Sequence, residues 1–97
     1  MKKANLNTKI KTNSKVISKK LKRNTNLLDP DRGRVHILNE TASFIWEEIR
    51  KGVKVRKIID DIVIEFDVKK EVAQKDVLEF ISKYQKNNII NIVKPSS

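Results

Sequence analysis

The chain has 97 residues and a formal net charge of +10; 38% of its residues are hydrophobic and 35% are charged. A chain of this length forms one domain with a modest core, and no apolar run approaches the roughly 20 residues that cross a membrane. The sequence contains no cysteine, which excludes disulfides, thiolate metal ligands and a cysteine nucleophile. The basic residues at its start are not followed by an apolar segment, so we expect no secretory signal and a cytoplasmic protein.

Most of the positive charge lies near the N-terminus. Residues 1–23 contain nine basic and no acidic side chains, whereas residues 24–97 contain the other 13 basic residues and all 12 acidic ones. Residues 1–14 are rich in Lys, Asn and Thr, and this composition predicts a basic, flexible N-terminal arm. An arm that contacts an acidic partner is the alternative. We expect the folded domain to span residues 15–93 and residues 94–97 to form a tail.

Three short antiparallel strands are predicted first. Residues 15–21 are a weak candidate for the first strand, and Leu27 and Leu28 belong to the second. The turn at residues 29–33 contains Pro, Asp and Gly, each of which favours a tight turn for its own steric or hydrogen-bonding reason. Residues 34–38 then alternate polar and apolar until the last residue, which is typical of a half-buried strand.

Three amphipathic helices are predicted next, over about residues 40–51, 55–65 and 71–86. Asn39 is a suitable N-cap for the first of them, and residues 89–93 are a candidate final strand. The fold class is therefore α+β, with a three-stranded antiparallel sheet followed by three helices, similar to a winged helix-turn-helix. The apolar residues that share a helical face are Ala42, Ile45, Trp46 and Ile49 in the first helix, Val55, Ile58, Ile59, Ile62 and Phe66 in the second, and Ala73, Val77, Phe80, Ile81 and Tyr84 in the third.

No catalytic or metal-binding constellation is present in the sequence. His36 is the only histidine, and no cysteine or second histidine is available to complete a zinc site. The adjacent carboxylates of Glu47 and Glu48, and of Asp60 and Asp61, diverge by about 100° around a helix and do not converge on one point. With only two glycines, the chain has no phosphate-binding loop. We therefore predict a protein that is not an enzyme and that needs no metal or cofactor.

The winged-helix shape raises the alternative of nucleic-acid binding. The predicted second and third helices carry mixed charge and lack the concentrated positive charge that neutralises phosphates. A winged-helix shape without a DNA-binding function is therefore favoured, although non-specific contact through the basic arm stays open.

The segment from Leu27 to Ile90 resembles the PqqD family. The matching features are the run LLDPDRGRVHILNETASFIW, a Gly-containing break at Lys51 and Gly52, the helix VRKIIDDIVIEF and the helix DVLEFISKY. Members of this family are small peptide chaperones of pyrroloquinoline quinone biosynthesis. Their wider class comprises the leader-peptide recognition domains of ribosomally made, modified peptides. The resemblance covers about two-thirds of the chain and leaves residues 1–14 outside it.

The resemblance implies that a precursor's leader lies in a cleft between the third strand and the third helix, where it pairs with the strand edge. The domain would then present the peptide to a modifying enzyme. Arg34 and His36 would protect this edge while it is empty. The implied peptide-binding residues are Arg34, Val35, His36, Ile37 and Leu38 on the strand and Val72, Lys75, Asp76, Glu79, Phe80 and Lys83 on the helix.

The implied partners are a precursor leader peptide and a modifying enzyme, with no membrane involved. The enzyme is either a radical enzyme that uses S-adenosylmethionine and an iron–sulfur cluster or a lasso-peptide maturation enzyme. Two competing functions remain: a small winged-helix nucleic-acid-binding protein, and an adaptor that binds another protein through the same edge.

Overall fold

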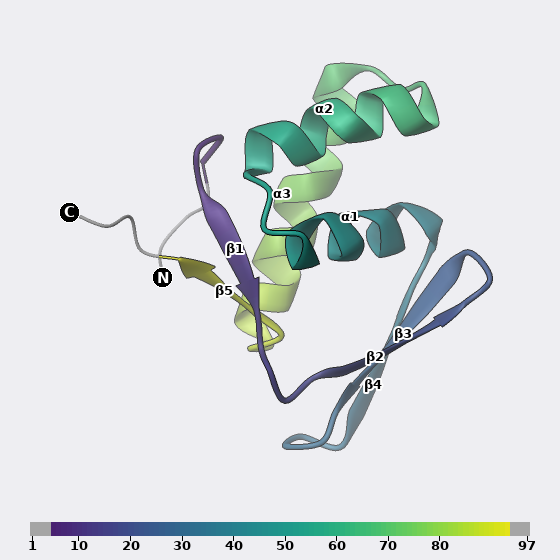
Figure 1. The fold of residues 1–97 in the computed structure, drawn as a ribbon, viewed down its shortest axis with the longest axis vertical. Coiled ribbons are helices and arrows are strands. Elements are labelled where there is room, and N and C mark those ends of the chain that lie inside the picture. The colour runs from purple at the N-terminus through teal and green to yellow at the C-terminus, as the bar shows by residue number, and fades with distance from the viewer. Residues whose placement is uncertain (1–4, 94–97) are drawn as a thin grey trace.

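The computed structural model describes residues 5–93, so predictions about residues 1–4 and 94–97 lie outside the described residues. This part of the chain forms two antiparallel sheets and three helices (Figure 1). The predicted α+β class, with a three-stranded antiparallel sheet and three helices, is confirmed. A second, two-stranded sheet of β1 and β5 is an addition to that prediction. In chain order the elements are β1 (Lys9–Thr12), β2 (Ile17–Leu21), β3 (Asn24–Asp29), β4 (Arg34–Leu38), α1 (Glu40–Arg50), α2 (Val55–Phe66), α3 (Lys70–Lys86) and β5 (Ile90–Val93).

The three-stranded sheet has the order β2–β3–β4 and is built from two consecutive hairpins (Figure 1). Lys22, in the tight turn between β2 and β3, has a positive φ of 56°. In the turn between β3 and β4, the Asp31 N–H donates to Asp29 Oδ1 over 3.2 Å, and Gly33 has a φ of 62°. The predicted turn chemistry is therefore used, because a left-handed residue such as Gly33 lets the chain reverse without a steric penalty.

Helix α1 follows β4 with a single residue between them. That residue, Asn39, caps the helix by accepting the Ala42 N–H on its side-chain oxygen over 2.9 Å. At the other end, Gly52 has a φ of 80° and donates its N–H to the Ile49 carbonyl over 2.9 Å. Because only one residue joins them, the orientation of β4 is tightly coupled to the orientation of α1.

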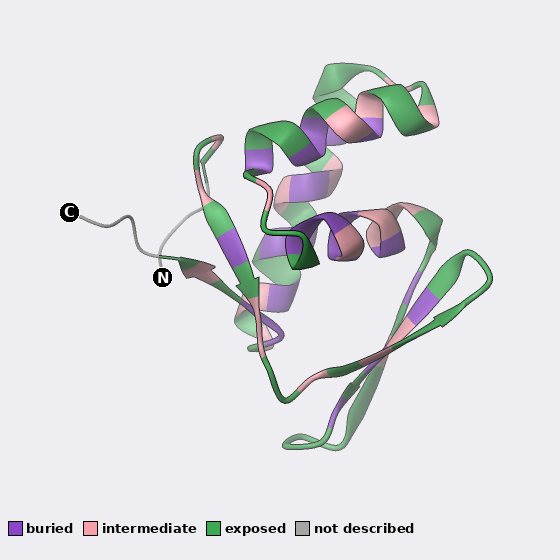
Figure 2. Ribbon diagram, viewed as in Figure 1, coloured by how far each residue is buried: buried purple, intermediate pink, exposed green. Residues whose placement is uncertain are grey.

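The hydrophobic core lies among the three helices and the inner faces of the two sheets. The residues predicted to share helical faces are buried, apart from Ala42 and Phe66, which are half-buried. Strands β3 and β4 add Leu27 and Leu38 to this core, and Figure 2 shows buried and exposed residues alternating on the helices. The helices are amphipathic, and none within residues 5–93 combines the length and apolarity needed to cross a membrane.

Strand β1 belongs to a segment for which the sequence predicted a flexible arm. It pairs antiparallel with β5, with Lys9 opposite Val93, and its Ile10 is only 3% exposed in the core. The segment just before β1 also caps the N-terminus of α2. The carbonyls of Leu6 and Thr8 accept backbone N–H groups of the first turn of α2 over 2.9 and 3.0 Å. The described part of residues 1–14 is therefore packed on the domain, and its strand partner lies about 80 residues away in the sequence.

Candidate functional site

The outer side of β4 is an open strand edge. Within residues 5–93, β4 pairs with β3 on one side and with no strand on the other. In an antiparallel pair, every second residue directs its N–H and C=O away from its neighbour strand. The open side of β4 therefore presents a row of backbone donors and acceptors that another extended segment can satisfy.

A cleft of about 350 Å³ lies beside this edge, between β4, the start of α1 and α3. Its walls combine apolar and charged side chains, which suits an extended peptide that presents both apolar and charged side chains. Five predicted site residues line it, namely Ile37, Asp76, Glu79, Phe80 and Lys83. The lining residues that were not predicted as site residues are Asn39, Thr41, Ala42, Ile45 and Tyr84.

An aromatic cluster forms one wall of the cleft. The ring of Tyr84 lies 4.6 Å from that of Phe80 and meets the ring of His36 edge-on at 5.5 Å, measured between centroids. The Nζ atom of Lys83 lies 5.4 Å from the centre of the Tyr84 ring. Burial raises the pKa of the Tyr84 phenol, so this group stays neutral at physiological pH. These packed rings give the cleft a rigid apolar surface that links β4 to α3.

The alternation predicted for β4 is present, and His36 and Leu38 are on its more buried side. Leu38 is buried and His36 is half-buried against Tyr84, whereas Val35 and Ile37 are 60% and 71% exposed. His36 therefore lies inward, where it does not shield the edge as the sequence suggested. Leu38 belongs to the core and offers no side chain to a ligand.

The remaining predicted residues lie away from the cleft. The guanidinium of Arg34 donates to the Asn87 side-chain oxygen over 3.5 Å, near the C-terminal end of α3. Val72 and Lys75 are exposed on α3, four residues and one residue before Asp76, the first α3 residue that lines the cleft. The structure thus brings together the second half of α3 and the end of β4, and it leaves the first turns of α3 outside.

The cleft residues that sequence reasoning missed have recognisable local signals. Tyr84 follows Phe80 by four residues, which places the two rings on one face of a helix. Asn39, Thr41 and Ala42 belong to the short junction between β4 and α1, so any ligand beside the end of β4 also meets the first turn of α1.

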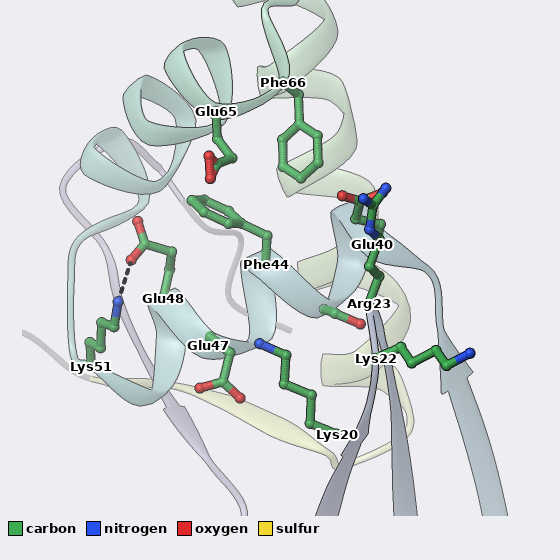
Figure 3. A pocket seen from close by; sticks show the side chains of 11 residues that line it. Lys20, Lys22, Arg23, Glu40, Phe44, Glu47, Glu48, Lys51, Glu65 and Phe66 are labelled. Atoms are coloured by element: carbon green, nitrogen blue, oxygen red, sulfur yellow. Dashed lines mark ion pairs between the residues drawn. The ribbon is translucent and has the colours of Figure 1, made fainter.

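A second cavity, of about 520 Å³, lies between the β2–β3 turn, α1 and the end of α2 and contains none of the predicted site residues (Figure 3). Two pairs of opposite charge lie in its lining, with Arg23 3.8 Å from Glu40 and Lys51 3.8 Å from Glu48. Within residues 5–93, no three potential metal-ligating side chains are grouped closely enough to hold an ion. This cavity therefore has the features of a charged surface depression.

Comparisons with known proteins agree with this fold. A family model described as coenzyme PQQ synthesis protein D (PqqD) matches residues 25–90, which is more than half of the chain. A solved structure described as TbiB1 in complex with the TbiA(beta) leader peptide superposes with a TM-score of 0.78 at 21% identity, covering 90% of this chain and 99% of that one.

A second solved structure, described as lasso peptide synthetase B1 complexed with the leader peptide, also has a TM-score of 0.78, at 18% identity, and covers 86% of this chain and 98% of that one. Identities this low establish a shared fold. No curated protein sequence matches the chain significantly. Because the family model spans the β3–β4 hairpin, all three helices and the start of β5, the chain belongs to the PqqD family.

Proposed function

We propose that this protein binds the leader segment of a ribosomally made precursor peptide at the open edge of β4 and presents the precursor to a modifying enzyme. The observation that carries this proposal is the position of the open edge directly beside the cleft between β4 and α3. The protein has no catalytic role of its own in this scheme. It supplies a binding surface, and the enzyme supplies the chemistry.

Strand addition explains how one surface provides both affinity and register. An added strand lies about 4.8 Å from β4 and satisfies the backbone groups on its open side. Alternate side chains of that strand then point into the cleft, toward Phe80 and Tyr84, where apolar side chains are favoured. The carboxylates of Asp76 and Glu79 and the ammonium of Lys83 lie at the same cleft and favour oppositely charged groups of the leader.

The related structures support this choice of ligand. Both solved structures are described as complexes with a leader peptide, and their fold covers most of this chain. The likeness to lasso peptide synthetase B1 supports a lasso-peptide maturation enzyme as the partner, whereas the family description supports a partner in coenzyme PQQ synthesis. The second partner would be a radical enzyme that uses S-adenosylmethionine and an iron–sulfur cluster.

A titration followed by nuclear magnetic resonance tests the proposal. Isotope-labelled full-length protein is titrated with a candidate leader peptide from a precursor gene beside its own gene. We expect amide shifts concentrated in β4 and the second half of α3, and smaller changes in β1 and β5. A leader that leaves β4 and α3 unchanged, together with salt-sensitive DNA binding, would replace this function with nucleic-acid binding.

A substitution in the edge strand sharpens the same test. Val35→Pro removes a backbone N–H and fixes φ in β4, so strand addition should weaken strongly if the edge is the site. The matched control is Val93→Pro at the end of β5, which lies outside the cleft. Circular dichroism verifies that both variants are folded before their leader affinities are compared. Equal leader affinities for the two folded variants would contradict binding at β4.

A further inference from the structure

The outer face of the β2–β3–β4 sheet is unusually apolar for a solvent-exposed surface. Of the eight large apolar side chains that are strongly exposed within residues 5–93, five lie on this face, and Figure 2 shows exposed segments along all three strands. Ile17, Leu28 and Val35 form a row across the three strands, because Ile17 is opposite Leu28 and Leu28 is opposite Val35. Ile37 continues this apolar surface along β4, whereas Lys19, which is opposite Asn26, separates Leu21 from the row.

Basic side chains dominate the segment that carries this face. Between Lys15 and Ile37 the chain has seven basic and two acidic residues. Of the two carboxylates, that of Asp29 is buried and that of Asp31 lies 3.6 Å from Lys15 Nζ. Four of these cations are directed elsewhere, because Lys20, Lys22 and Arg23 line the cavity beside α1 and Arg34 reaches Asn87. Lys19 alternates with Ile17 and Leu21 along β2 and therefore lies on the outer face, and no acidic residue occupies an outward position on the three strands. The outer face is therefore apolar and weakly basic, without a carboxylate of its own.

This chemistry argues against three occupants. A second copy of the chain would bring together two molecules that each carry a net charge of +10, which is repulsive. Nucleic-acid-binding sheets stack bases on aromatic rings, and this face carries aliphatic side chains instead. Membrane-interface surfaces typically use Trp and Phe with Leu, on an amphipathic helix, and this face has neither aromatic residues nor a helix.

We propose that the outer face is the docking surface for the modifying enzyme, and that the matching surface of the enzyme is apolar and carries acidic groups. This inference rests on the proposed function. An exposed apolar surface with charged groups beside it is typical of protein interfaces, and opposite charges on the two partners speed association and exclude wrong partners. The leader would occupy the edge of the sheet and the enzyme its face, and Ile37 borders both surfaces.

The bound leader would enlarge this docking surface. Val35 and Ile37 lie on β4, next to the position of an added strand, and alternate side chains of that strand point to the outer face. The enzyme would therefore contact the protein and its leader together. It follows by linkage that the leader raises the affinity for the enzyme by the same factor by which the enzyme raises the affinity for the leader.

The test uses Ile17→Glu, which places a negative charge in the apolar row two strands, or about 10 Å, from the leader edge. Ile17 is 58% exposed, so the fold tolerates the substitution. The matched control is Ile64→Glu, because Ile64 is 80% exposed on α2. Calorimetry measures the affinity of each full-length variant for the leader peptide, and for the purified modifying enzyme of the same gene cluster with and without leader.

We expect Ile17→Glu to weaken enzyme binding by about tenfold or more, to leave leader affinity within about twofold, and to differ from Ile64→Glu. Equal enzyme affinities for the two variants would overturn the docking surface. Two other results would also overturn it. One is a dimer, detected by sedimentation velocity, that only Ile17→Glu abolishes, and the other is binding to phosphatidylglycerol vesicles that only Ile17→Glu abolishes. Absent leader binding in the unsubstituted protein overturns the proposed function alone, because the titration with enzyme in the absence of leader still reports on the outer face.

Discussion

Glu48 shows at the scale of one residue how a charged side chain is accommodated in the core. It is buried on α1, one of its oxygens lies 3.8 Å from Lys51 Nζ, and it interacts with the Asp61 carboxyl of α2. Burial, and next the neighbouring Asp61, raise the pKa of Glu48 to about 7. The side-chain hydrogen bond with Glu48, and after it the hydrogen bond from Lys57, whose Nζ lies 2.9 Å away, lower the pKa of the Asp61 carboxyl. The folded protein therefore favours a protonated Glu48 beside an ionised Asp61.

This arrangement predicts that stability falls as the pH rises between about 4.5, the usual pKa of the glutamate side chain, and about 7. In that window the folded state holds a proton that the unfolded chain has released, so raising the pH favours unfolding. Glu48→Gln mimics the protonated acid and should exceed the unsubstituted protein in stability at pH 8 by an amount on the order of 1 kcal/mol. At pH 4 this advantage should vanish.

Urea unfolding at pH 4 and pH 8 measures this effect, with Glu47→Gln as the control at an adjacent and more exposed position of α1. A Glu48→Gln variant that is less stable than the unsubstituted protein at pH 8 would show that the ionised carboxylate is favourable in the fold.

At the scale of elements, β4 shows that a strand's alternation does not determine which of its faces is buried. Leu27 pairs with His36, so the two side chains lie on the same face of the sheet. Leu27 and Leu38 are both fully buried, and residues two apart share a face, so His36 must point inward with them. Val35 and Ile37 are therefore directed to the outer face. Leu38 is fixed in the core next to the start of α1, and its position determines which residues of β4 point inward.

Strand β1 carries a prediction at the same scale. Because Ile10 is buried and β1 pairs with β5, Ile10→Ala should destabilise the protein by about 2–4 kcal/mol. The control is Ile17→Ala on β2, whose exposed side chain should contribute less than about 1 kcal/mol. Chemical unfolding compares the two. If Ile10→Ala were as stable as Ile17→Ala, residues 9–12 would be a flexible arm in solution, as the composition suggested.

At the scale of the whole molecule, the fold separates the edge of β4 from the outer face of its sheet and from the β1–β5 sheet. The edge of β4 and the cleft beside it face the aromatic wall of α3, the outer face of the sheet is apolar and basic, and β1–β5 closes the core on the other side of α1 (Figure 1). A small domain can hold two ligands at once when one takes a strand edge and the other a sheet face. The helices make the strand edge and the sheet face rigid, because the inner side of the same sheet packs on them.

Leader binding at the edge should stabilise the whole domain. A ligand that binds only the folded state at 100 times its Kd adds about 2.7 kcal/mol to the free energy of unfolding. For a domain of this size we expect the Tm to rise by about 10 °C or more. Differential scanning fluorimetry with the leader, and with a scrambled peptide of the same composition, checks this. A scrambled peptide that is equally effective would show binding by charge alone.

Local signals in the sequence determined most of the elements. Turns, caps and helix boundaries depend on residues within four positions of each other, and Asn39, Gly33 and Gly52 perform the roles their chemistry predicts. The span of β4 and the apolar helical faces followed from periodicity alone, because that periodicity reflects the geometry of one element. The α+β class followed from the order of these elements.

Tertiary structure alone decided where those elements meet. The pairing of β1 with β5 joins residues about 80 positions apart, and four residues of alternating sequence contain no information about so distant a partner. The inward turn of His36, the cleft shared by α1 and α3, and the apolar outer face all depend on which side of the sheet the helices cover. A period of two specifies that a strand has two different faces, and only packing selects the one that is buried.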